Sequence, residues 1–114
     1  MKTFILFLSL FVSGSLLAQE KPTVITEKFQ VSGVCDMCKT RIEKAAMYTK
    51  GVKKADWNPE TGLIEVVYHT GKTNRNAIEQ NIAKAGYDTE GAKADAKAYD
   101  ALPHCCQYKS NEKH

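Results

Sequence analysis

Residues 31–43 read VSGVCDMCKTRIE, and the rest of the chain is arranged around them. The segment predicts the end of a β-strand, a short loop that carries Cys35 and Cys38, and the first turn of a helix. The unpaired N–H groups and the positive dipole end of a helix N-terminus favour a thiolate over a thiol. We therefore expect the two cysteines to bind soft metals or to attack disulfides. The helix is expected to be amphipathic, because small and apolar residues recur on one of its faces, namely Ile42, Ala45, Ala46 and Thr49.

The chain has 114 residues and a formal net charge of +3, which allows one small domain with a modest core. Its lysines and arginines are mixed with acidic residues and form no long basic block with interleaved aromatic side chains. Nucleic acid is therefore not expected as a partner.

Residues 1–19 have the pattern of a secretory signal peptide. Lys2 supplies the positive start, residues 4–12 form an apolar run, and small residues follow, so we expect cleavage after Ala18 or Gln19. An N-terminal membrane anchor is the alternative, but the apolar run is shorter than the roughly 20 residues that span a bilayer. The sequence thus predicts a secreted protein, located in the periplasm after cleavage.

Alternating apolar residues predict three strands, and residues spaced by three or four predict two helices. A short fourth strand is expected at residues 87–91. The order strand, helix, strand, strand, helix, strand predicts an α+β fold of the ferredoxin-like split βαβ type, βαββαβ, with an antiparallel sheet and two helices on one face. The strands are expected at residues 23–31, 52–57 and 63–69, one helix between the thiol loop and Gly51, and the other from Thr73 or Asn74 to Gly86.

Four sequence features at matching places resemble the heavy-metal-associated domain of copper chaperones, periplasmic mercury-binding proteins and the N-terminal modules of metal-pumping ATPases. The resemblance covers residues 23–89 and implies a metal-binding domain at residues 23–92. The features are Cys35-x-x-Cys38, Ile42-Glu43, Gly51-Val52 and Ala85-Gly86-Tyr87.

The thiol loop departs from that family in one respect. Family loops usually read Gly-Met-x-Cys-x-x-Cys, whereas Gly33-Val34-Cys35 is one residue shorter and has no methionine before the first thiol. We expect Val34 to pack beneath the loop in its place.

Two thiolates on one flexible loop suit a soft ion of low coordination number, whereas zinc prefers four ligands. Cys35 and Cys38 are therefore predicted to bind Cu(I), with Ag(I) or Hg(II) as alternatives. The resemblance implies that Tyr87 lies beside the loop without binding the ion, and plain core packing is the alternative for this residue. Met37, between the thiols, is expected to support the site by packing. The expected role is sequestration, or delivery to a metal-transporting membrane protein or another thiol-bearing acceptor, by a monomer or a metal-bridged dimer.

Two other functions remain open for the same pair. An exported Cys-x-x-Cys at a helix start also occurs in thiol–disulfide oxidoreductases, but this chain lacks the length and element order of a thioredoxin domain. The pair can also form an inert structural disulfide. No nucleophile, base and orienting group occur together, so we do not expect an enzyme.

A tail at residues 93–114 follows the expected domain. Residues 92–102 are alanine-rich and predict a helix that Pro103 stops. A fourth strand would carry the chain away from the thiol loop, but the ten residues 94–103 can cover about 15 Å as a helix or 33 Å extended, so the tail can return.

Cys105 and Cys106 in that tail have three interpretations. They can complete a metal site with the loop, form a separate thiol-rich site, or form disulfides. Neighbouring cysteines pair with each other only under strain, and a chain of this size can bury a core without disulfides. The sequence favours a role in metal binding, without His104 as a ligand.

Overall fold

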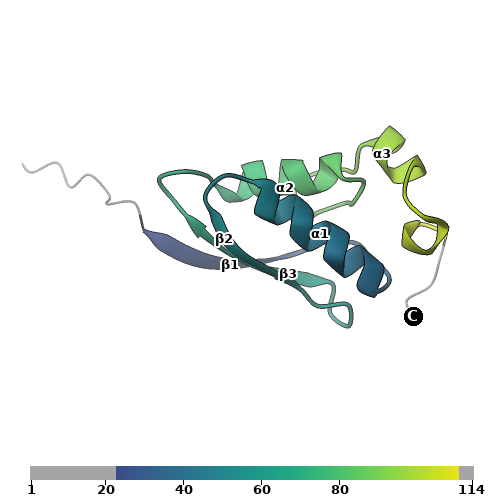
Figure 1. The fold of residues 1–114 in the computed structure, drawn as a ribbon, viewed down its shortest axis with the longest axis horizontal. Helices are drawn as coiled ribbons and strands as arrows, with labels where there is room; N and C mark the ends of the chain where they lie inside the picture. The colour runs from purple at the N-terminus through teal and green to yellow at the C-terminus, as the bar shows by residue number, and fades with distance from the viewer. Residues whose placement is uncertain (1–22, 111–114) are drawn as a thin grey trace, which may run out of the picture.

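The computed structural model describes residues 23–110. The predicted signal peptide at residues 1–19 and the last four residues of the tail lie outside the described part. The elements, labelled in Figure 1, are β1 (Val24–Gln30), α1 (Asp36–Tyr48), β2 (Val52–Trp57), β3 (Leu63–His69), α2 (Arg75–Lys84), α3 (Ala96–Asp100) and the 3₁₀ turn η1 (His104–Cys106).

The sheet has three antiparallel strands in the order β1-β3-β2. Both α1 and α2 cover one of its faces (Figure 1). Alternate residues of β3, Ile64, Val66 and Tyr68, are buried, as the period of a half-buried strand requires. The predicted ferredoxin-like arrangement with two helices on one face of an antiparallel sheet is confirmed.

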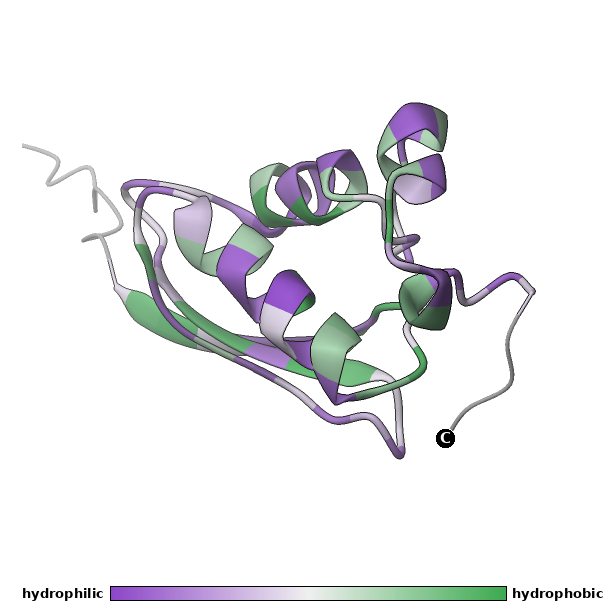
Figure 2. Ribbon diagram, turned by 45° about the vertical axis from the view of Figure 1, so that its right-hand side comes forward, coloured by the Kyte–Doolittle hydropathy of each residue, from purple (hydrophilic) through white to green (hydrophobic). Residues whose placement is uncertain are grey.

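The core between the sheet and the helices includes residues from both ends of the described chain. Figure 2 shows apolar segments of the sheet and helices facing each other. Tail residues take part in the same cluster, so the tail is packed against the domain. The cluster consists of Phe29, Val31, Val34, Cys38, Ile42, Ala46, Trp57, Ile64, Val66, Tyr68, Ile78, Ile82, Tyr87, Leu102 and Cys106.

The prediction of a fourth strand at residues 87–91 is wrong within the described residues, where only an isolated bridge joins Val31 to Thr89. The buried Glu79 carboxylate explains the difference. It accepts hydrogen bonds from Thr89 Oγ1 at 2.9 Å and from Gly91 N at 2.7 Å. These bonds turn the chain back toward α2, so the ladder cannot continue.

The tail also follows a different course from the one predicted. The backbone N–H groups of Ala94 and Asp95 donate to Asp88 Oδ1 and Ala83 O, at 2.7 and 2.9 Å. The tail therefore starts beside the end of α2, not at the far end of the sheet. The predicted helix at residues 92–102 shortens to α3, since Asp95 caps it by accepting from Ala98 N.

Among residues 23–110, no helix is long and apolar enough to cross a membrane.

Candidate metal centre

The thiol loop is anchored on both sides before the first cysteine. Val31 N donates to Gly62 O and Ser32 N donates to Asp88 O, each at 2.9 Å. Gly33 is packed so tightly that an added Cβ would lie 2.9 Å from the Trp57 ring. Val34 is buried, as expected for the residue beneath the loop. These contacts fix the loop in space, so the cysteines start from a defined position.

Cys35 is the N-cap residue of α1, and Cys38 lies in the first turn of that helix. The two Sγ atoms are 3.9 Å apart. Cys35 is half-buried, whereas Cys38 is fully buried. The predicted pair is therefore placed at a helix start with both sulfurs facing the same space.

The pKa of Cys35 is lowered from its ordinary value of 9.0. Burial raises it, but the backbone N–H groups of Cys38 and Met37, together with the Cys38 and Cys106 thiols, outweigh that effect. The neutral Cys35 thiol accepts no capping hydrogen bond of normal geometry. We therefore infer that the N–H groups stabilise mainly the thiolate, because its negative charge attracts them more strongly. A helix start thus favours the metal-binding form of this cysteine.

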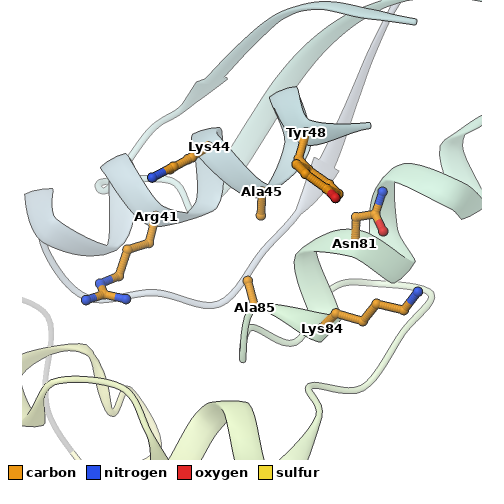
Figure 3. Close-up of a pocket in the computed structure, with 7 residues that line it drawn as sticks. All are labelled: Arg41, Lys44, Ala45, Tyr48, Asn81, Lys84 and Ala85. Atoms are coloured by element: carbon orange, nitrogen blue, oxygen red, sulfur yellow. The ribbon is translucent and has the colours of Figure 1, made fainter. Parts of the chain in front are cut away.

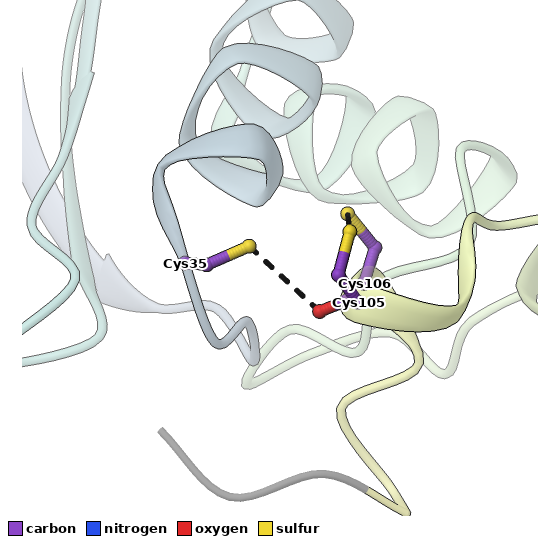
Figure 4. Close-up of side chains that lie close together, drawn as sticks. All are labelled: Cys35, Cys105 and Cys106. Atoms are coloured by element: carbon purple, nitrogen blue, oxygen red, sulfur yellow. Dashed lines mark hydrogen bonds between the residues drawn. The ribbon is translucent and has the colours of Figure 1, made fainter. Parts of the chain in front are cut away.

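The turn η1 brings the tail cysteines to the loop (Figure 4). The Sγ atoms of Cys35, Cys105 and Cys106 all lie within 4.8 Å of one another. Cys105 and Cys106 are 4.0 Å apart at their sulfurs, and the Cys35 thiol lies 3.7 Å from the Cys105 carbonyl oxygen. Because Cys38 is 3.9 Å from Cys35, the four described thiols form one cluster.

Cys106 contributes a fully buried sulfur to this cluster. Burial, together with the neighbouring Cys38 thiol, raises the pKa of Cys106 to about 12. Without a cation nearby, Cys106 is therefore a thiol at neutral pH.

Met37 and Tyr87 both lie against the cluster. The Cys105 thiol is 3.5 Å from the Met37 thioether sulfur. The Tyr87 side chain is fully buried, and its hydroxyl has no hydrogen bond of normal geometry within the described residues. Burial raises the pKa of Tyr87, as do the neighbouring Cys38 and Cys106 thiols. The Tyr87 hydroxyl thus lies beside the Cys38 and Cys106 sulfurs but makes no hydrogen bond of normal geometry with them.

The sequence analysis did not identify the residues that hold the tail in place. Tyr108 Oη donates to Gly86 O at 3.0 Å and accepts from Asp88 N at 2.9 Å. Its ring stacks on the Tyr87 ring, with 5.8 Å between the ring centroids, and contacts the Tyr99 ring edge-on, with 5.1 Å between the centroids. Two aromatic residues flanking the Cys-Cys pair were the available signal, since tyrosines in an otherwise polar tail indicate packing.

Residues 28–88 match the family described as the heavy-metal-associated domain. The chain belongs to this family. The match begins in β1 and ends shortly after α2, so it includes the whole thiol loop and excludes the tail that carries Cys105 and Cys106.

Individual relatives of this heavy-metal-associated protein include a mercuric transport protein and a copper-transporting ATPase. It is 34% identical over 87 residues to a "Mercuric transport protein periplasmic component" of Shewanella putrefaciens, covering 76% of this chain and 93% of the relative. It is 40% identical over 86 residues to "Copper-transporting ATPase 1" of Rhizobium meliloti, covering 71% of this chain but only 10% of the ATPase. Among solved structures, the "CopZ metallochaperone" is 33% identical with a TM-score of 0.55, covering 57% of this chain and 98% of its own.

A separate groove lies between α1 and α2 of the heavy-metal-associated domain (Figure 3). It has a volume of about 390 Å³ and contains none of the described thiols. We therefore assign it no part in holding the metal ion. Its lining is cationic and apolar, and consists of Arg41, Lys44, Ala45, Tyr48, Asn81, Lys84 and Ala85.

Proposed function

We propose that this protein is an exported carrier of a soft metal ion, most directly Cu(I), which it binds through Cys35 and Cys38. One observation carries the proposal. Two thiols of a heavy-metal-associated domain lie 3.9 Å apart at the start of α1. A metal–thiolate bond is about 2.3 Å long, so sulfurs at this separation can bind the same ion after small side-chain movements.

The donor set supports Cu(I) as the cargo. Thiolates are soft ligands, and a pair of them satisfies a Cu(I) ion that needs few ligands. Copper is named for an ATPase relative, and the metallochaperone neighbour has the same fold. Mercury is named for the periplasmic relative, so Hg(II) is the alternative cargo and Ag(I) shares the same chemistry.

The predicted signal peptide at residues 1–19 and the periplasmic relative support a periplasmic location. The partner would then be a metal-transporting membrane protein or another thiol-bearing acceptor. Thiol pairs on both sides would exchange the ion through shared coordination. The carrier would act as a monomer that contacts its acceptor briefly, with a metal-bridged dimer as the alternative.

The proposed role is binding and transfer without catalysis. A thiol–disulfide oxidoreductase is the competing function, because the lowered pKa of Cys35 also favours attack on a disulfide. The two functions predict different behaviour of the reduced protein, so one set of measurements separates them.

The test is competition for Cu(I) against a chromophoric chelator under anaerobic conditions. It uses the reduced mature protein and a Cys35→Ser/Cys38→Ser variant, with circular dichroism to verify the fold. The proposal expects tight binding of one ion by the wild type and its loss in the variant. A parallel competition with Hg(II) decides the preferred cargo.

Two results would overturn the proposal. One is a wild-type protein that cannot compete for either ion. The other is rapid turnover of a disulfide substrate by a protein that binds metal weakly, which would favour the oxidoreductase.

A further inference from the structure

The tail cysteines are placed as ligands to an ion bound at the loop. With metal–sulfur bonds of about 2.3 Å, sulfurs around one ion are separated by roughly 4.0 Å in trigonal geometry and roughly 4.6 Å in linear geometry. The Sγ atoms of Cys35, Cys105 and Cys106 lie within 4.8 Å of one another. One soft ion can therefore reach all three with little movement of the chain.

This placement depends on specific packing of the tail. Leu102 is 6% exposed and Cys106 is 0% exposed, and both belong to the main core. Gly86, with φ of 105°, lets the tail approach so closely that a Cβ there would lie 3.0 Å from the backbone of Ala98. The hydroxyl of Tyr108 joins the tail to Gly86 and Asp88. A docked tail holds its two thiols over the loop.

The buried Tyr87 hydroxyl is a second, independent indication of a ligand. A buried hydroxyl without a partner is destabilising, yet this one, which has no hydrogen bond of normal geometry within the described residues, faces the Cys38 and Cys106 sulfurs. Binding of a cation converts these thiols to thiolates, which are strong acceptors for the phenol O–H. The hydroxyl is therefore suited to the metal-loaded site.

Resting on the proposed function, we propose that Cys105 and Cys106 bind the same soft ion as Cys35, so that the tail closes the loop into a site of at least three thiolates. Cys38, 3.9 Å from Cys35, completes the cluster as the fourth sulfur. The closed site retains its ion, because an incoming acceptor thiol finds the coordination positions filled. Transfer then requires the turn η1 to move away from α1.

The experiment counts the sulfur neighbours of bound Cu(I) by X-ray absorption spectroscopy, at less than one ion per reduced protein. It compares the wild type with Cys105→Ser/Cys106→Ser. Cys105→Ser alone is the second variant, because Cys105 is half-buried and its replacement disturbs the core less than that of Cys106. Gln107→Ser, directly after the turn, is the matched control.

The inference expects at least three sulfur neighbours in the wild type and in Gln107→Ser, and two in the double variant. The double variant should lose Cu(I) affinity by a factor of about ten or more, and it should release the ion faster to an acceptor dithiol. Cys105→Ser alone should lower the sulfur count in the same direction.

Two sulfur neighbours and equal affinity in all four proteins would overturn this inference and leave the loop carrier intact. If the wild type fails to bind Cu(I), both the carrier and the closed site are wrong. If Cys35→Ser/Cys38→Ser retains wild-type affinity, the loop proposal fails on its own account, because the tail would then bind the ion without it.

Discussion

At the scale of single residues, the Tyr87 hydroxyl is expected to contribute to metal binding and not to the stability of the metal-free fold. Its hydroxyl is buried without a hydrogen bond of normal geometry in the described residues, next to the sulfurs of Cys38 and Cys106. The metal-free protein therefore gains nothing measurable from the hydroxyl, whereas a site of thiolates would gain a donor.

We predict that Tyr87→Phe leaves the metal-free protein as stable as the wild type or stabilises it by about 1 kcal/mol, because an unsatisfied polar group is removed. The same variant should bind Cu(I) several-fold more weakly. Urea unfolding of the metal-free protein and chelator competition measure the two effects. A loss of stability with unchanged affinity would show that the phenol serves only the core. Tyr48→Phe, at a side chain that is 85% exposed, is the control.

At the scale of elements, the contact between the tail and the end of α2 depends on Tyr108. Its hydroxyl makes two hydrogen bonds to the backbone and its ring lies between Tyr87 and Tyr99. Burial raises the pKa of Tyr108 to about 12, so the hydroxyl remains a donor throughout the neutral range.

We predict that Tyr108→Phe weakens tail docking by about 1–3 kcal/mol, since Gly86 O and Asp88 N both lose their partner. Amide hydrogen exchange should accelerate at Asp88 and along residues 94–108, while exchange in β3 stays unchanged. Equal acceleration in β3 would contradict this expectation, because it would mean that the tail and the domain unfold together.

A small ion cluster also joins α1 to β2. Lys39 Nζ lies 2.6 Å from Asp56 Oδ1 and donates to Trp57 O at 3.0 Å, while Glu43 accepts from Trp57 N. The hydrogen bond from Lys39 and its positive charge lower the pKa of Asp56 below the ordinary value of 3.8. Folding therefore favours the charged form of this carboxylate.

We predict that the stabilisation from Asp56 is fully present above pH 3.8 and is lost as the pH falls through the lowered folded-state value. At pH 6, Asp56→Asn should be only slightly less stable than the wild type, because the Lys39–Asp56 pair is exposed and screened. Below pH 4, the free energy of unfolding of Asp56→Asn should depend less steeply on pH than that of the wild type. Thermal unfolding across pH 2.5–6 measures both effects, with Asp100→Asn as the exposed control. An unchanged acid profile would mean that the pair contributes nothing.

At the scale of the whole molecule, the sequence predicted the features that arise from local patterns. Alternation in residues 52–57 and 63–69 predicted β2 and β3 with their observed bounds, and Cys35 with Cys38 was placed correctly at a helix start. The fourth strand and the course of the tail depend on contacts between distant residues. The Glu79 carboxylate accepts hydrogen bonds from Thr89 and Gly91. The periodicity of apolar residues along the chain does not indicate these bonds.

The burial of Cys38 and Cys106 has a consequence for thiol labelling. In the reduced protein without metal, an alkylating reagent meets two half-buried thiols, Cys35 and Cys105, and two fully buried ones. We predict two fast and two slow modification steps by intact mass, since a buried thiol reacts only when the structure opens. Tyr108→Phe should make the Cys106 step fast and leave the Cys38 step slow. Four equally fast steps in the wild type would contradict the packing of the tail.

For the exported carrier proposed above, the same burial would make docking of the tail a form of protection. A chain that crosses a membrane unfolded arrives in an oxidising compartment with all its thiols accessible. Once the tail has docked, an oxidant has access to half as many thiols as in the unfolded chain, and Cys106 is covered by the core that it helps to form. The interval between arrival and docking is therefore when unwanted disulfides compete with folding, and early metal loading would shorten that interval.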